Sequence, residues 1–171
     1  MSDLEGLTVG QIRQKAREDA AKTAELYLGD SAFPVDPVAV ARDMGAQVFS
    51  AQLGDDVYGM VKGTANGIEI FIDEDNPRVR QRFTVAHEIG HVVSNSGVLA
   101  AGVGYVEKRS EEGTGTADEI YANEFAASIL MPADAVTEAH KDNPNIFRLA
   151  KHFDVSTSAM GWRLRHLGLA Y

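Results

Sequence analysis

The chain of 171 residues contains no cysteine, which excludes disulfide bonds, thiolate metal sites and cysteine nucleophiles. Any metal ion must therefore be bound by histidine, aspartate or glutamate. Basic residues are also scarce, because 16 Lys and Arg stand against 25 Asp and Glu and give a formal net charge of -9. This balance argues against a surface built to bind nucleic acid or anionic lipid.

Long apolar runs are missing as well. The first residues, MSDLEGLTVG, have neither the basic nor the apolar region of a secretory signal. The longest uncharged stretch, 92–106, is interrupted by Asn95, serines and glycines, so no membrane-spanning helix is predicted. With 44% hydrophobic and 24% charged residues, the composition is typical of a cytoplasmic globular protein. The length predicts one compact domain over residues 1–171.

Helical patterns dominate both ends of the chain. Apolar residues four apart predict a helix over 8–28, and Asp36 followed by Pro37 predicts the start of a second over 36–44. A third helix is expected from Asn76–Pro77 to about Ser94; from Phe83 onward it is apolar on nearly every side, so it should be central. Four more are expected over 117–131, after Pro132, over 145–153 and over 156–167.

The middle of the chain predicts a small sheet and a long loop. Three candidate strands, 46–50, 57–62 and 68–72, indicate a three-stranded antiparallel sheet with a hairpin, and hence an α+β fold. The segment 57–61 could be an edge strand for an extended substrate, and its Gly59 a bulge. Residues 95–115 have five glycines and no periodicity, which suggests either a cover over a cleft or a simple connector.

The chemistry is concentrated in the sequence HEIGH, residues 87–91. In a helix, residues four apart share a face, so His87 and His91 can bind one zinc ion. Glu88 can reach water at that metal without being a ligand, as a general base must. The flanking FTVA and VV embed these polar residues in an apolar helix, where unpaired polar groups would be costly.

A catalytic zinc site needs a third protein ligand, and Glu119 is the best candidate downstream. It starts a predicted helix that could pack against the first, although Thr116 and Glu119 also fit a capping box. Asp118 and Glu124 are the alternatives for this ligand. Asn123 lies one turn after Glu119, placed to accept an N–H from a ligating histidine.

Three motifs together resemble the ImmA/IrrE family of zinc-dependent metallo-endopeptidases: QRFTVAHEIGH, then Glu119 to Ala126 (EIYANEFA), then SILMP. The resemblance covers roughly residues 8 to 171. It implies zinc ligands at His87, His91 and Glu119, a catalytic glutamate at Glu88, and a minimal thermolysin-like zincin fold with a three-stranded sheet flanked by helices. Family members are typically cytoplasmic and often encoded in mobile elements. They cleave helix-turn-helix repressors, and some are paired with such a regulator in a toxin–antitoxin-like arrangement.

The C-terminal residues 141–171 resemble a helix-turn-helix and carry five basic against two acidic residues. DNA contact is one interpretation, but Gly161 would weaken a recognition helix, so we favour a helical pair that packs on the body and docks a protein. The expected function is cleavage of a specific protein by a zinc endopeptidase. A binding module with structural zinc and a DNA-binding regulator are the alternatives, and Glu88 favours the enzyme.

The sequence leaves the donor to the developing oxyanion undetermined. The candidates are Tyr58, Tyr105, Tyr121, Arg109 and His140.

Overall fold

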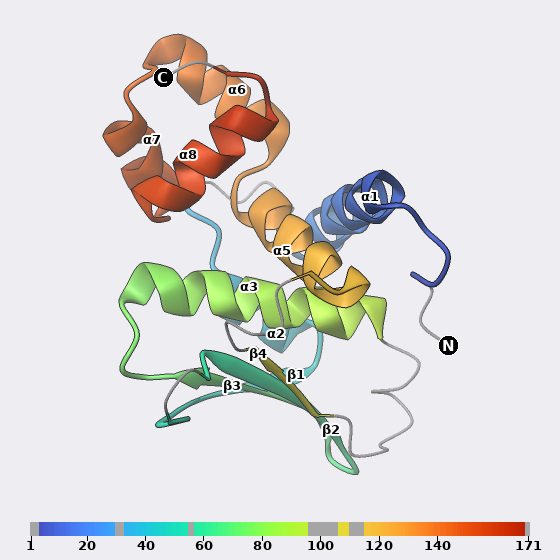
Figure 1. Cartoon of the computed structure of the whole chain (residues 1–171). Helices are drawn as coiled ribbons and strands as arrows, with labels where there is room; N and C mark the ends of the chain where they lie inside the picture. Colours follow the sequence, from blue (N-terminus) through green and yellow to red (C-terminus); the bar gives the residue numbers. More distant parts are fainter. Residues whose placement is uncertain (1–3, 30–32, 55–56, 96–105, 110–114, 170–171) are drawn as a thin grey trace.

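In the computed structural model, the helices lie on one face of a small sheet (Figure 1). The structure describes residues 4–29, 33–54, 57–95, 106–109 and 115–169, with side chains in all but 106–109. In chain order the elements are α1 (Val9–Tyr27), α2 (Pro37–Asp43), β1 (Ala46–Ala51), β2 (Gly59–Thr64), β3 (Gly67–Asp73), α3 (Arg78–Ser94), β4 (Val106–Arg109), α5 (Ala117–Leu130), α6 (Ala133–Asp142), α7 (Ile146–Phe153) and α8 (Thr157–His166).

Side-chain caps fix where several helices begin. Asp36 accepts hydrogen bonds from the backbone of Val38 and Ala39 at the start of α2, with Pro37 as its first residue. Thr116 and Ser156 cap α5 and α8 in the same way. The α3 helix differs from the prediction because Pro77, which has no capping side chain, occupies the cap position. The helices expected from the sequence are therefore all present, with ends shifted by one or two residues.

The sheet has four strands in the order β1-β3-β2-β4. The β2–β3 hairpin is antiparallel, as expected, but β1 runs parallel to β3, with Val48 opposite Ile70. The predicted three-stranded antiparallel sheet is therefore corrected to a four-stranded mixed one within the confirmed α+β class. The fourth strand, β4, pairs antiparallel with β2, so β2 is not an edge strand.

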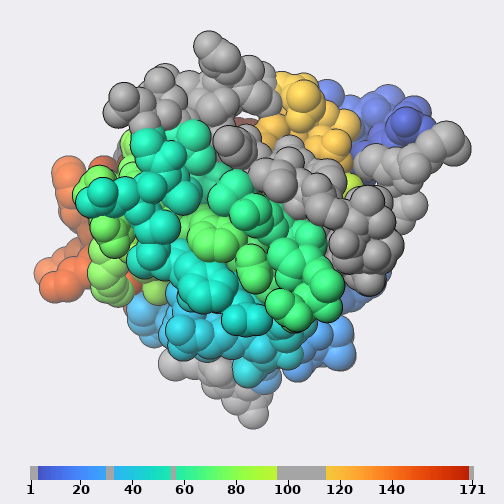
Figure 2. Space-filling view, turned by 90° about the horizontal axis from the view of Figure 1, so that it is seen from below, coloured from blue at the N-terminus to red at the C-terminus, as the bar shows by residue number. Residues whose placement is uncertain are grey.

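The α3 helix lies between the sheet and α5 and forms the centre of the fold (Figure 1). Its residues from Thr84 to Val92 are all buried, as the apolar flanks of HEIGH predict. Val61 and Ile70 of the sheet face it and are fully buried. The view from below shows the opposite face of the sheet (Figure 2). Phe49, which is 39% exposed, stacks on its strand neighbour Phe71.

The helices α7 and α8 form the expected helix-turn-helix-like pair and are fastened to α3. At the turn between them, Asp154 has a left-handed conformation, with φ of 53°. Arg82 of α3 binds its carboxylate at 3.0 Å and its carbonyl oxygen at 3.1 Å, and Arg78 pairs with the same carboxylate. Within the described ranges, no helix combines the length and apolarity that a bilayer span requires.

Candidate metal centre

Two histidines of α3 and one glutamate of α5 converge in the interior. The Nε2 atoms of His87 and His91 are 3.0 Å apart, and the Glu119 Oε1 lies 3.5 Å from the first and 3.3 Å from the second. All three residues are buried, and in the described part of the chain they are the one such group that could hold a metal ion. We call them the His-His-Glu cluster.

The spacing of the cluster matches a tetrahedral metal ion. With zinc-to-ligand distances of about 2.0–2.1 Å, two ligand atoms of a tetrahedron lie about 3.3–3.4 Å apart. The three separations in the cluster, 3.0 to 3.5 Å, scatter around that value. Two imidazole nitrogens and one carboxylate oxygen are also a donor set that zinc uses in catalytic sites, where a fourth position stays open. The cluster therefore fits zinc in both geometry and chemistry.

Asn123 orients the first histidine of the cluster. The Nδ1 of His87 lies 3.1 Å from the Asn123 Oδ1. An amide oxygen can only accept, so this hydrogen bond requires the tautomer of His87 with its proton on Nδ1, which leaves the Nε2 lone pair for a metal. Asn123 and Glu119 are one turn apart on α5, which explains how one helix reaches the cluster twice.

Glu119 fits both the capping box and the metal cluster, because its backbone and its side chain make different contacts. Its backbone N–H donates to the Thr116 hydroxyl at 3.2 Å, so the helix start is capped, while its side chain turns to the histidines. Burial alone would raise the pKa of Glu119, but hydrogen bonding and charge from the two imidazoles hold this pKa well below its usual value. The carboxyl group is therefore kept in the anionic form that binds metal.

The alternative third ligands lie elsewhere. Glu124 is buried, but its carboxylate pairs with arginines: it lies 2.8 Å from Arg17 Nε, 3.5 Å from Arg163 Nη1 and 3.9 Å from Arg13 Nε. Asp118, at the start of α5, is outside the cluster. Of the three acidic residues considered, Glu119 alone meets both histidines.

Gly90 allows α5 to approach α3 closely enough for this meeting. A Cβ at Gly90 would lie 3.0 Å from the Cα of Ala122 and 3.3 Å from the Cβ of Phe125. These are tight contacts with backbone and fixed atoms, so a larger residue would push the helices apart. A glycine inside a helix pattern often marks such close packing, so the sequence held a signal for this contact.

Glu88 lies on a different side of α3, against strand β2. It is fully buried, and a Cβ added at Gly59 would come 2.7 Å from its Oε1 and 2.4 Å from the Thr84 Cγ2. Gly59 is therefore a point of close contact between sheet and helix, and the interpretation as a bulge is wrong, since Gly59 pairs in register with Ile72 and Arg109. The sheet thus packs directly against the carboxylate next to the cluster.

The candidates for oxyanion donor are separated by the structure. Tyr121 is fully buried and donates to the Asp19 Oδ2 on α1 at 2.8 Å, and His140 lies on α6. Tyr58 precedes Gly59, and Arg109 is the strand partner of Gly59, so both belong to the segments beside Glu88.

Tyr105 lies outside the described residues, as does most of the expected cover at 95–115; within that segment, residues 106–109 form β4 instead of loop.

Comparisons with known proteins support the fold and the family. The family model of Peptidase M78, the IrrE N-terminal-like domain, matches residues 41–165. A solved structure of a Mycobacterium tuberculosis transcriptional regulator superposes with a TM-score of 0.61 at 19% identity over 90% of this chain. The chain spans 46% of the length of that protein. A search of curated proteins gave no match.

Proposed function

Because the chain belongs to the Peptidase M78 family of IrrE N-terminal-like domains, we propose that it is a zinc-dependent endopeptidase that cleaves a specific protein. The observation that carries this proposal is the tetrahedral spacing of the His-His-Glu cluster, with Glu88 buried next to it. His87, His91 and Glu119 would hold the ion, and Asn123 would orient His87. When bound, zinc would supply Lewis acidity that polarises the scissile carbonyl and lowers the pKa of water.

Glu88 is the proton carrier in this proposal. Its carboxylate takes a proton from the attacking water as the hydroxyl oxygen bonds to the carbonyl carbon. The same proton then passes to the amide nitrogen as the carbon–nitrogen bond breaks, so that the products are a carboxylic acid and an amine. Gly59 limits where the carboxylate can lie, because the strand backbone packs against it. Tyr58, the residue before Gly59, is the proposed donor to the oxygen that gains charge.

The proposed substrate is a helix-turn-helix repressor or an antitoxin-like partner, as the ImmA/IrrE resemblance implies. The similar solved structure is itself a transcriptional regulator, which is consistent with a regulatory setting. The α7–α8 pair supports a protein partner better than DNA, because Ser158, Ala159 and Trp162 of α8 face a groove toward the body. We propose that this pair helps dock the substrate.

Cleavage that depends on Glu88 is the test. Wild-type protein and Glu88→Gln are each loaded with zinc and incubated with the repressor encoded beside the gene, and new N-termini are identified by mass spectrometry. We expect one specific cut with wild type and none with Glu88→Gln, which keeps the shape of the side chain. Glu138→Gln, on an exposed position of α6, is the matched control and should cleave normally. Cleavage by both zinc-loaded proteins, or by neither, would refute the mechanism, and the latter would favour the binding module.

The ligand assignment has its own test, which needs no substrate. We expect His87→Ala, His91→Ala and Glu119→Ala each to lose most zinc affinity in competition with a chelator, because each removes one of three protein ligands. Retention of full zinc occupancy by Glu119→Ala would move the third ligand elsewhere.

A further inference from the structure

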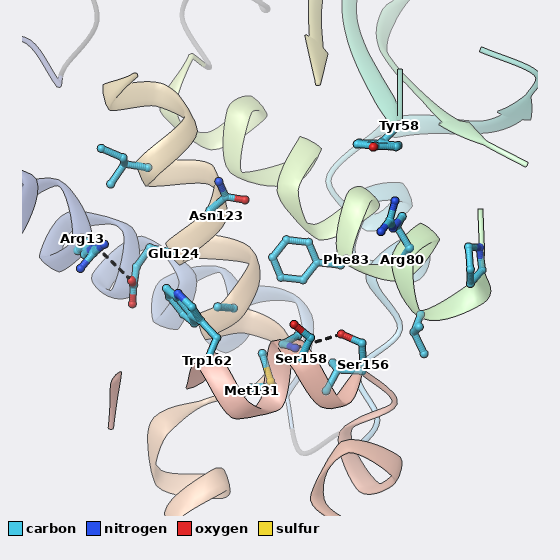
Figure 3. A pocket seen from close by; sticks show the side chains of 16 residues that line it. Arg13, Tyr58, Arg80, Phe83, Asn123, Glu124, Met131, Ser156, Ser158 and Trp162 are labelled. Atoms are coloured by element: carbon cyan, nitrogen blue, oxygen red, sulfur yellow. Dashed lines mark hydrogen bonds and ion pairs between the residues drawn. The ribbon is translucent and has the colours of Figure 1, made fainter. Parts of the chain in front are cut away.

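A groove of about 740 Å³ lies between α3, α5 and α8 (Figure 3). Its walls are mostly apolar: Phe83 comes from α3, Ile120 from α5, Met131 from the end of α5, and Val155 and Trp162 from the C-terminal pair. A groove of this size, with several large apolar side chains, can bury a bulky side chain of a ligand.

The groove begins at the proposed catalytic centre. Phe83 is one turn before His87 on α3, and Asn123, which binds His87 at 3.1 Å, lines the same groove. In Figure 3, Asn123 and Phe83 both project into the space between the helices. A polypeptide held at the His-His-Glu cluster could therefore place a neighbouring side chain in the groove without leaving the surface of the protein.

The α8 wall of the groove is firmly attached. Arg163 is 3% exposed, and its Nε donates to the carbonyl oxygen of Met131 at 2.8 Å. Arg82 holds the turn before α8 through Asp154. The groove is therefore a preformed feature, and its walls need little reorganisation to accept a ligand.

Arg80 lies at the edge of the groove. The Arg80 guanidinium lies 5.0 Å from the centre of the Tyr58 ring, and Arg80 makes no ion pair with any residue that the structure describes. The other groove arginine, Arg13, is turned to Glu124 at 3.9 Å. Although the net charge of the chain is -9, Arg80 puts a positive charge at the edge of the groove, and this charge is complementary to an acidic side chain of a ligand.

From this arrangement we propose that the groove selects the substrate, taking a bulky apolar side chain next to the scissile bond while Arg80 binds an aspartate or glutamate of the same extended segment. The inference rests on the proposed peptidase function and adds the chemistry of the sequence that is cut. The apolar part follows from Phe83, Met131 and Trp162, and the acidic part from Arg80.

The protein carries its own probe for this proposal, because Trp162 is the one tryptophan of the chain and lines the groove. Zinc-loaded Glu88→Gln protein is titrated with capped heptapeptides of alanine that have Leu or Gly at the centre and Asp or its isostere Asn at one other position. The pH is held constant because His166 stacks on the indole, with ring centres 3.7 Å apart. Tryptophan fluorescence then reports binding in the groove.

We expect Leu peptides to bind more than about tenfold tighter than Gly peptides, from burial of the side chain. At the peptide position that lies opposite Arg80, Asp should raise the affinity by at most about fivefold relative to Asn, which is the range of an exposed ion pair. Arg80→Gln should abolish the Asp preference and keep the Leu preference, whereas Arg42→Gln, on an exposed position of α2 outside the groove, should keep both. Ala159→Leu, which fills the groove, should remove the fluorescence response to Leu peptides.

Equal binding of Leu and Gly peptides would overturn the apolar part of the proposal. An Asp preference that is absent, or that survives Arg80→Gln, would overturn the acidic part. These outcomes are measured with a protein that cannot cleave, so they are independent of the peptidase test. If the groove binds as expected but wild-type protein cuts nothing, the proposed function fails and the groove assignment stands.

Discussion

Replacing Gly59 by alanine should disable the site while leaving the metal ligands in place. The new Cβ would lie 2.4 Å from the Thr84 Cγ2 and 2.7 Å from the Glu88 Oε1, where ordinary contacts begin at 3.4 Å. The methyl group of Thr84 and the carboxylate of Glu88 would have to move by about 1 Å or less, a displacement that can lower a rate about a hundredfold. We therefore expect kcat/KM to fall about 100-fold, or about 2.7 kcal/mol of transition-state stabilisation. Overpacking should also reduce the free energy of unfolding by about 1–3 kcal/mol.

The assay separates the two effects of this substitution. Cleavage kinetics on the regulator, urea unfolding and zinc content are measured for Gly59→Ala and for Gly59→Ala combined with Thr84→Ser. The second variant lacks the clashing methyl group, so it should regain much of the lost stability, but it should stay poorly active because the contact with Glu88 remains. Zinc content should be unchanged in both. Wild-type kcat/KM in folded Gly59→Ala would refute the claim that strand β2 positions Glu88.

Three further predictions concern Asn123 and the contact between Tyr121 and Asp19. Asn123→Ala should lower zinc affinity about 10- to 100-fold in chelator competition, because His87 loses its orienting partner, and unchanged affinity would contradict that role. Tyr121→Phe should reduce the free energy of unfolding by about 1.5–3 kcal/mol in urea, since the 2.8 Å hydrogen bond to Asp19 is lost; a change near zero would show that it contributes nothing. Burial would raise the pKa of Asp19, but hydrogen bonds from Tyr121 and Lys15 outweigh burial and hold this pKa below its usual value. Its stabilisation is therefore present above the unfolded pKa of about 3.9 and is lost as the pH falls through the folded value, so the acid limb of the stability curve should be flatter in Asp19→Asn.

The site could be predicted from the sequence largely because helices are local structures. Helical spacing alone puts His87 and His91 on one face of α3. It likewise puts Glu119 and Asn123 on one face of α5, and the structure brings these two faces together. Cap residues such as Asp36 likewise locate helix starts within a residue or two. These inferences need only the geometry of one turn.

The sheet could be predicted only in part, because pairing depends on distant segments. Nothing local in 46–51 distinguishes a parallel from an antiparallel neighbour, and β1 pairs parallel with β3, which itself pairs antiparallel with β2 on its other side. Strand β4 has only four residues among glycine-rich sequence, so its pairing with β2, and not its own pattern, makes it a strand. The edge position expected for 57–61 was wrong for this reason.

The buried carboxylate of Glu124 connects α1, near the start of the chain, with α8, near its end. The carboxylate, 1% exposed, is met by Arg17 from α1 and by Arg163 from α8, at 2.8 and 3.5 Å. The residues that match the family model begin at 41, after α1 has ended, so a fragment cut at that boundary would keep the anion and lose two of its three cations. Removing partners from a buried charge is strongly destabilising. The smallest unit that folds cooperatively should therefore be longer than the region by which the family is recognised.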